Sequence, residues 1–455
     1  MSESKMVPSP SKEAMEYVNE KIEELKKFVY RCIHCRACRF SYSGEPDRIG
    51  YGEPGEYSGM VYGCVAGMMN EWEPFWASGK NWITRAILEG KLEVSDALVD
   101  FLFACPTCGN CQVQCDNRIP TVDLIEHVRA FVLQRGVTPR PRHVYFWRST
   151  MENNNPYGEK HEERTAWIED PELRKKVVDR EGVKMAYYVG CTASYRQKHI
   201  ANGTAKLLDM LGEEYAIYTD EWCCGSPSFR TGNFDVGWRV MRHNIELFQK
   251  QGIETIFFSC AGCFRTWYVD YPKHAPRFNL DVSGFKFIHA VEYFYNKLKS
   301  GELRFKDGVR IEKKVCWHDP CHTGRHIVIF ERERRGYDQL SFEPFDFVEW
   351  KEQWFNMPRE ILKSIPGIEF VEMYRIKDNS MCCGCGGGLK SGYPDMALEV
   401  AYQRLKEAEA AGAEWVVTSC PFCWRNLYDA QVAYKTKVEV RDLTELLLPI
   451  IEVAK

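Results

Sequence analysis

The sequence MCCGCGGG at residues 381–388 places two adjacent cysteines, Cys382 and Cys383, immediately before a glycine-rich stretch. Neighbouring side chains of an extended chain point to opposite faces, so both thiols can reach one inorganic centre only where the backbone turns sharply. Gly384 and the glycines at 386–388 permit such a turn, because glycine accepts positive φ angles and lets backbone N–H groups approach a ligand. The stretch therefore predicts a metal-binding loop.

Three more cysteines complete a set of five: Cys321 in HDPCHTGR (318–325), and Cys420 and Cys423 in SCPFCW (419–424). A cuboidal 4Fe-4S centre takes four protein ligands, so the set has one thiol in excess. An equivalent set occurs earlier in the chain, at an offset of 159 residues for the second CCG cysteine and 160 for the first CxxC cysteine. This offset indicates an internal repeat. The earlier set is Cys191, Cys223, Cys224, Cys260 and Cys263.

The N-terminal part carries a different cysteine pattern, CIHCRAC at 32–38 and CPTCGNCQVQC at 105–115. In ferredoxins with such runs, three cysteines of a run bind one cluster and the fourth binds the other. We expect two 4Fe-4S centres here. One would be held by Cys32, Cys35, Cys38 and Cys115, and the other by Cys64, Cys105, Cys108 and Cys111.

Cys64 departs most from the ferredoxin spacing, because 25 residues separate it from Cys38 where three are usual. The proline that usually follows the fourth cysteine is replaced by Val65 and Asp116. The alternative is that Cys64 is a buried free thiol and the second centre is 3Fe-4S. The spacer at 41–63, rich in Gly, Tyr and Glu, predicts a loop.

Residues 11–30 have the apolar spacing of a helix. Apolar runs such as MAYYVGC, IYTDEWCCG, TIFFSCAGC, KVCWHDPC, FVEMYRIKDNSMCCG and WVVTSCPFC each lead to cysteine, and several precede helix-like sequence. Strands alternating with helices predict parallel sheets, with sites beyond the carboxyl ends of the strands. The expected fold is α+β and multidomain: a mainly helical ferredoxin-like domain with two clusters (1–143), a linker (144–183), and two pseudo-symmetric α/β modules (184–310 and 311–455).

The composition, 45% hydrophobic and 27% charged over 455 residues, is that of a globular protein. A net charge of -4 gives no electrostatic reason to expect nucleic acid or an anionic membrane as a partner. No apolar run approaches the roughly 18 residues of a membrane span, and the N-terminus lacks the apolar core of a signal peptide. We expect a cytoplasmic protein that reaches the inner face of a membrane only through a partner.

The twenty cysteines have three alternative interpretations: a disulfide scaffold, zinc knuckles, and thioredoxin-like redox pairs at CAGC and CPFC. The size of the chain, the CxxCxxC run and the CCG pairs favour iron–sulfur centres over all three. Cys316 and Cys385 lie outside both sets and are expected to be buried thiols. His318 and His322, beside Cys321, either pack around a centre or donate to sulfur or substrate.

The order of cysteine, CCG and CxxC resembles the cysteine-rich CCG module of heterodisulfide reductases. The whole chain resembles the D-type polypeptide of that family, which is equivalent to the fused C-type and B-type polypeptides; iron–sulfur subunits of glycolate oxidase and of anaerobic glycerol-3-phosphate dehydrogenase are similar. The resemblance implies a noncubane 4Fe-4S cluster in each module and a disulfide substrate such as the coenzyme M–coenzyme B heterodisulfide. Its catalytic ligands would be Cys191, Cys223, Cys224, Cys260, Cys263, Cys321, Cys382, Cys383, Cys420 and Cys423.

The resulting hypothesis is an oxidoreductase subunit in which two ferredoxin-type clusters pass electrons to two noncubane clusters that reduce a disulfide. No flavin or nicotinamide motif is evident, so a flavin- or cytochrome-containing partner subunit would supply the electrons. The rival hypothesis is an electron-transfer subunit of a membrane-linked dehydrogenase or quinone-reducing complex, without a substrate of its own. A structural or regulatory iron–sulfur protein is a third.

Sixty residues separate Cys321 from Cys382, against 31 between Cys191 and Cys223, which indicates an insertion near 331–356. We expect its aromatic residues to form an exposed patch that contacts a partner subunit. A cover over the protein's own sheet is the alternative. The residues are Phe345, Phe347, Trp350, Trp354 and Phe355. Because the repeat supplies two similar cysteine-lined edges, we also expect substrate to enter between the modules.

Overall fold

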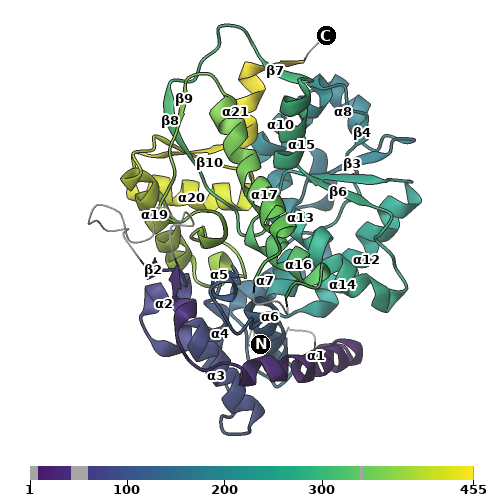
Figure 1. The fold of residues 1–455 in the computed structure, drawn as a ribbon. Coiled ribbons are helices and arrows are strands. Elements are labelled where there is room, and N and C mark those ends of the chain that lie inside the picture. The colour runs from purple at the N-terminus through teal and green to yellow at the C-terminus, as the bar shows by residue number, and fades with distance from the viewer. Residues whose placement is uncertain (1–8, 42–59, 339–341, 454–455) are drawn as a thin grey trace.

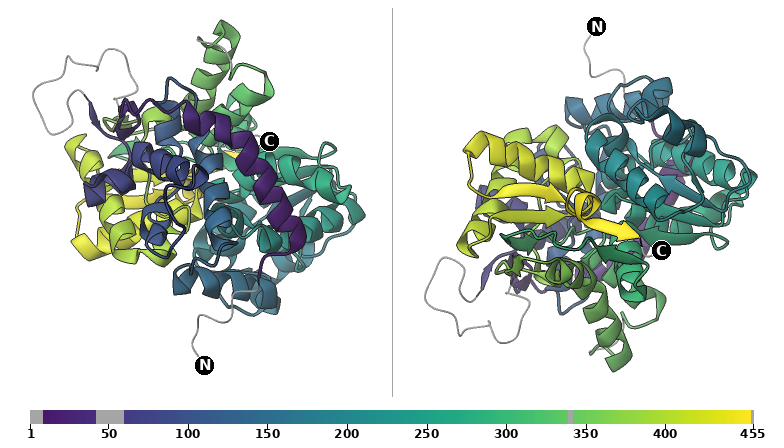
Figure 2. Two further views of the ribbon diagram at one scale, coloured as in Figure 1. Left: turned by 90° about the horizontal axis from the view of Figure 1, so that it is seen from below. Right: turned by 90° about the horizontal axis from the view of Figure 1, so that it is seen from above.

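The computed structural model describes residues 9–41, 60–338 and 342–453. Helices of the N-terminal part lie at one end of the molecule, and two α/β modules stand side by side above them (Figure 1). Seen from below, α1 runs across the N-terminal end (Figure 2). The fold is α+β, with each module built on its own parallel sheet.

Over residues 9–41 and 60–143, the regular structure of the N-terminal part is helical, apart from a short antiparallel pair, β1 (Phe40–Ser41) and β2 (Val61–Tyr62). The helix expected at 11–30 is present as α1 (Lys12–Tyr30), where the Ser11 hydroxyl caps the first turn by accepting from the Ala14 N–H at 3.1 Å. Its apolar face packs against α6. The other helices are α2 (Val65–Asn70), α3 (Ala77–Leu88), α4 (Leu98–Phe103), α5 (Asn110–Val113) and α6 (Thr121–Leu133).

The segment expected to be a linker, 144–183, contains helical structure that packs on the first module. Its elements are α7 (Pro141–Asn153), the 3₁₀ turn η5 (His161–Thr165) and α8 (Pro171–Val177). Arg164 and Trp167 are both buried. The segment therefore contributes to the interior of the protein.

The first module has four parallel strands in the order β4-β3-β5-β6. These are β3 (Met185–Tyr188), β4 (Tyr215–Ala216), β5 (Thr255–Phe258) and β6 (Lys286–His289). Its helices are α9 (Cys191–Tyr195), α10 (Lys198–Met210), α11 (Ser226–Arg230), α12 (Phe234–Lys250), α13 (Ala261–Arg265), α14 (Tyr271–His274) and α15 (Ala290–Ser300). All four residues of β3 are buried, as is usual for a strand covered on both faces.

The second module repeats this topology, with parallel strands in the order β9-β8-β10-β11. These are β8 (Lys313–Trp317), β9 (Ile368–Phe370), β10 (Trp415–Thr418) and β11 (Glu439–Asp442). Its helices are α16 (Arg325–Arg334), α17 (Phe345–Ser364), α18 (Leu389–Gly392), α19 (Pro394–Ala410), α20 (Pro421–Tyr434) and α21 (Leu443–Ile450). In both modules the first strand lies between the second and the third, so the repeat in the sequence is a repeat of fold.

The modules are also joined far from the cysteines. The last strand, β12 (Ile451–Val453), pairs antiparallel with β7 (Leu303–Phe305), which follows α15 of the first module. Helices α10 and α21 pack together across the same boundary. These contacts fix the orientation of one sheet relative to the other.

The insertion near 331–356 forms the end of α16 and much of α17. Phe347 and Phe355 are buried with Val328, and the Trp354 Nε1–H donates to the Thr323 carbonyl at 2.6 Å. Phe345, in contrast, is 76% exposed. The prediction of an exposed aromatic patch is therefore wrong for most of its residues. The alternative, a cover over the protein's own sheet, describes α17, which packs on β8, β9 and α15.

The N-terminal part and both modules meet at one buried guanidinium. Arg129 on α6 is 0% exposed, and its nitrogens donate only to backbone carbonyls at 2.6–3.1 Å. The acceptors are Leu102, Cys105, Arg230 and Gly387. Three distant segments of the chain are thus held to one side chain.

We predict that Arg129→Met lowers the stability of the protein by about 3 kcal/mol or more, because each buried carbonyl left without a donor costs about 1–3 kcal/mol. Arg129→Lys should fall between Arg129→Met and the parent, since one ammonium cannot replace the five-donor fork. Thermal unfolding under anaerobic conditions measures both. Arg135→Met, at an exposed position just beyond the end of α6, is the matched control; an equal loss in the control would contradict the role of Arg129.

Candidate functional site

Three of the predicted ligand cysteines stand directly after strands. Cys191 begins α9 just beyond β3, and Cys260 and Cys420 are the N-cap residues of α13 and α20, beyond β5 and β10. Because the strands of each sheet are parallel, their carboxyl ends share one edge. These three cysteines therefore lie at the sheet edges, where the apolar runs before them predict that they should.

The CCG pairs are reached differently. The strands that precede them, β4 and β9, end at Ala216 and Phe370, and loops of several residues lead from there to Cys223 and Cys382. The apolar runs IYTDEWCCG and FVEMYRIKDNSMCCG thus lead to their cysteine pairs through loops.

Both CCG turns have the conformation expected from the glycines. Gly225 has φ of +84° and Gly384 has φ of +85°. A Cβ on Gly384 would lie 2.8 Å from the carbonyl oxygen of Ala397, so no other residue fits. In each turn the glycine N–H donates to the first cysteine sulfur of the pair, at 3.4 Å in the first module and 3.3 Å in the second.

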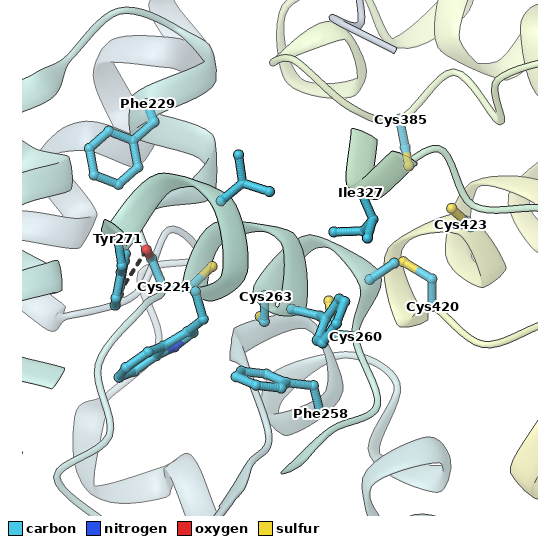
Figure 3. Close-up of a cluster of buried hydrophobic side chains, with 14 of the residues drawn as sticks. Cys224, Phe229, Phe258, Cys260, Cys263, Tyr271, Ile327, Cys385, Cys420 and Cys423 are labelled. Carbon is cyan, nitrogen blue, oxygen red and sulfur yellow. Dashed lines mark hydrogen bonds between the residues drawn. The ribbon is translucent and has the colours of Figure 1, made fainter. Parts of the chain in front are cut away.

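The cysteines of the two modules line one cavity of about 510 Å³. Figure 3 shows Cys224, Cys260 and Cys263 of the first module facing Cys420 and Cys423 of the second. Cys260 and Cys420, which correspond in the repeat, interact through their side chains. Nine of the ten predicted cysteines border the cavity: Cys191, Cys223, Cys224, Cys260, Cys263, Cys321, Cys383, Cys420 and Cys423.

Cys385 also belongs to this group, although it was expected to be a buried thiol outside the set. It is buried, but its Sγ lies 3.1 Å from the Cys383 Sγ, which is in turn 3.3 Å from the Cys423 Sγ. Cys316 differs. It lies within β8, and burial raises the pKa of its thiol to about 12, as for an ordinary core cysteine.

In the N-terminal part the structure brings together the same two groups that the spacing predicts, while metal ligation itself stays a prediction. Cys64, Cys105, Cys108 and Cys111 border one small cavity. Cys32, Cys35, Cys38 and Cys115 border another, which Cys111 also reaches. Cys64 is thus adjacent to the second run despite its unusual position in the sequence. The loop expected at 41–63 lies largely outside the described residues.

The N-terminal cysteines abut the second module. A hydrogen bond with the Cys382 thiol lowers the pKa of Cys108 to about 6. Arg325 fixes this contact by donating to the carbonyls of Cys108 at 2.8 Å and Ser380 at 2.5 Å. Gly387 is needed here too, because a Cβ would lie 2.5 Å from the Pro106 carbonyl carbon.

Histidines lie close to the cysteines of the second module. The side chains of His318, Cys383 and Cys423 have ligand atoms within 4.8 Å of one another, as do those of Cys321, His322 and His326. Burial lowers the pKa of His322 to about 4, so its ring is neutral. His326 was not singled out from the sequence; its position four residues after His322, on the helix that follows, was the available signal.

The cavity wall is basic, a feature that sequence reasoning missed. Five cationic residues border it, and no Asp or Glu does so within the described ranges. Arg196 is paired with Glu159 at 2.6 Å, and Lys390 with Asp429 at 2.7 Å. The five are Arg142, Arg196, Arg230, Lys390 and Arg425.

The residues around the cavity fit an iron–sulfur group. Cysteine sulfur is the usual protein ligand of iron–sulfur groups, and nine cysteines of the two sets border this one space. The glycine N–H groups supply donors at sulfur. Over the described residues, no helix has the length and apolar character needed to cross a membrane.

Comparison with known proteins gives a family match and several relatives. The cysteine-rich CCG domain family matches residues 185–266 and 348–428; the second match begins after Cys321. The chain is 34% identical to the D-type polypeptide of dihydromethanophenazine:CoB–CoM heterodisulfide reductase from Methanosarcina barkeri, covering 81% of this chain and 83% of that protein. The corresponding polypeptide from Methanosarcina mazei is also 34% identical, covering 83% and 85%.

A more distant relative is the B-type polypeptide of fumarate reductase (CoM/CoB) from Methanothermobacter marburgensis, 28% identical over 76% of this chain and 61% of that protein. Among solved structures, an aspartate racemase of Picrophilus torridus matches with a TM-score of 0.27 and 14% identity, covering 58% of this chain and 91% of that one. A likeness at that level carries no argument about fold or function.

Proposed function

The chain belongs to the D-type family of heterodisulfide reductase polypeptides, and we propose that it reduces a disulfide to two thiols in the cavity between its modules. The observation that carries the proposal is that nine cysteines of the two repeated sets line that one cavity. A protein that only relays electrons through 4Fe-4S centres needs four thiolates at each centre, not two sets of five cysteines.

Four iron–sulfur groups are proposed. Two cubane 4Fe-4S clusters would be held by the eight N-terminal cysteines and two noncubane 4Fe-4S clusters by the five-cysteine sets. When bound, such groups supply single electrons and an affinity for soft thiolate sulfur. The protein's own contribution is to hold the sulfur ligands and to shape the cavity where a disulfide sits.

The contacts of the chain give these groups an order. The exposed Cys35 lies at the outer end, Cys111 borders both N-terminal cavities, and Cys108 contacts Cys382 of the second module. The N-terminal cysteine groups therefore lie between the exposed Cys35 and the CCG pair of the second module. We propose that a partner subunit containing flavin or cytochrome docks at the outer end, in the cytoplasm, and that any membrane contact is made by that partner.

The reaction balances as one disulfide plus two electrons and two protons giving two thiols. The first and second modules present equivalent cysteines to the cavity, so each sulfur of a bound disulfide faces one set. Tyr145 is 40% exposed and borders the cavity, which therefore opens to solvent and to protons from water. Holding both sulfur atoms in place converts two separate encounters into one bound arrangement.

The cavity wall favours a disulfide with anionic groups through Arg142, because this cation has no carboxylate partner among the described residues and can bind an anion through charge-assisted hydrogen bonds. The other four cations of the wall are paired with carboxylates. The relatives are named as CoB–CoM heterodisulfide reductases, so the coenzyme M–coenzyme B heterodisulfide is the candidate substrate. The rival hypothesis, an electron-transfer protein without a substrate, predicts no dependence on these side chains.

We predict about sixteen iron atoms per chain in anaerobically purified protein, four in each of four groups. Iron and acid-labile sulfide analysis measures this number. A value near eight would remove the groups at the five-cysteine sets, and stoichiometric zinc would favour zinc knuckles.

We also predict that Cys224→Ser and Cys383→Ser each abolish disulfide reduction, because each removes a soft thiolate from one wall of the cavity. The EPR signals of the N-terminal clusters should survive in both variants. Cys316→Ser, which changes a buried thiol within β8, is the matched control and should keep both iron and turnover. If Cys224→Ser lost the first-module group but reduced the disulfide at the original rate, the second module alone would be the active site.

A third prediction concerns Arg142, an exposed cavity residue with no hydrogen bond or ion pair among the described residues. Arg142→Glu should lower kcat/KM for an anionic disulfide about tenfold, which corresponds to about 1.4 kcal/mol of lost binding. Most of the effect should appear in KM and shrink at high ionic strength. Arg148→Glu, on the same helix but not at the cavity, is the control; an unchanged kcat/KM in Arg142→Glu would argue against the anionic substrate.

A further inference from the structure

A buried ion pair lies beside the first cysteine of the first module. Arg164 on η5 and Glu221 are 2% and 1% exposed. The guanidinium is hydrogen-bonded to the Glu221 carboxylate, and its Nη1 and Nη2 also donate to the Cys191 Sγ at 3.7 and 3.8 Å. The same cationic fork thus reaches a carboxylate and a proposed cluster ligand.

Glu221 holds this arrangement in place. Besides Arg164, its carboxylate accepts from the backbone N–H groups of Val189 and Gly190, both at 2.9 Å. These residues connect β3 to Cys191, so the carboxylate fixes the loop and the arginine together. A buried charge pair of this kind keeps its geometry, because separating it would leave a charge without a partner.

Among the described residues no arginine donates to Cys321, the corresponding cysteine of the second module, where the buried Arg359 pairs instead with Asp319 at 2.8 Å. At the repeat offset of 159 residues, Glu221 corresponds to Ser380, a neutral residue whose hydroxyl donates to the Asp319 carbonyl at 3.2 Å. Arg164 itself lies in the segment that precedes the first module, outside the repeated sequence. The two otherwise equivalent cysteine sets therefore differ in their electrostatic surroundings.

The physical consequence follows from charge. Accepting one electron makes an iron–sulfur group more negative by one unit, and N–H donors or positive charge at its sulfurs stabilise that reduced form. The effect is stronger in a buried site than in water. The two N–H contacts from Arg164 to the Cys191 Sγ, at 3.7 and 3.8 Å, place this positive charge directly at the sulfur.

We propose that Arg164, positioned by Glu221, raises the reduction potential of the iron–sulfur group in the first module and leaves that of the second module unaffected. The inference rests on the proposed function, since it requires a redox group at Cys191. Arg164 is a positioning residue that acts through the ligand sulfur. It makes the first module a stronger electron acceptor than it would be without the arginine N–H groups at the Cys191 sulfur.

The test is an anaerobic redox titration followed by EPR, performed in a Cys383→Ser background so that the remaining module signal belongs to the first set. In the double variant Arg164→Gln/Glu221→Gln, which removes the pair without leaving a lone buried carboxylate, the midpoint potential of this signal should fall. In Glu221→Gln, which leaves the arginine charge uncompensated, it should rise. Arg164→Lys should give a smaller fall than the double variant.

Arg174→Gln is the matched control, because Arg174 bonds to Thr165 of the same turn rather than to a cysteine, and its variant should keep the midpoint. An unchanged midpoint in the double variant and in Glu221→Gln, with iron retained, would overturn the proposal and leave the pair a purely structural role. If the double variant fails to hold iron, the midpoint potential of Glu221→Gln tests the proposal: a rise supports it, and an unchanged or lower value overturns it. Absence of iron from the first module of the unmodified protein would instead refute the proposed function.

Discussion

The close approach of three segments around Arg129 is the constraint on which the arrangement of the site depends. Its guanidinium donates hydrogen bonds to the carbonyls of both Cys105 and Gly387. These two bonds hold the N-terminal cysteine run against the glycine-rich loop of the second module. Glycine at 387 is then required by sterics as well as by its φ of +58°. The loop that permits adjacent cysteines to turn toward one centre is thus also the loop that lets the N-terminal cysteines approach it.

The duplicated fold explains why the cavity has two similar walls. Each module brings its cysteines to the carboxyl edge of a parallel sheet, and the pairing of β7 with β12 and the packing of α10 on α21 turn those edges toward each other. Equivalent residues, Cys260 and Cys420, meet between the modules. The proposed substrate, a disulfide, has two reacting sulfur atoms. It therefore matches a site with two similar walls better than a substrate with a single reacting atom would.

The sequence predicted those features that depend on local spacing. The period of α1, the alternation of strands with helices and the grouping of Cys64 with the second N-terminal run all follow from residues close in sequence or from the count of cysteines. Features that depend on packing between distant elements were missed. Phe347 is buried because Val328 on α16 lies against it, and Arg142 and Arg425 share a wall although they are far apart in the chain.

Cysteine occurs in three different environments in the second module, and the position of each cysteine relative to the sheet determines its environment. Cys316 lies within a strand, where burial raises the pKa of its thiol. Cys383 lies beyond the strand ends, where neighbouring thiols lower its pKa and the backbone turn aims it at the cavity. Cys385 follows two residues later and contacts Cys383, yet no repeat partner predicts it, because Ser226 and Pro227 follow the first CCG. The duplication accounts for the shared five-cysteine frame, while Cys385, Arg164 and the α17 insertion each occur on one side only and make the two walls chemically unequal.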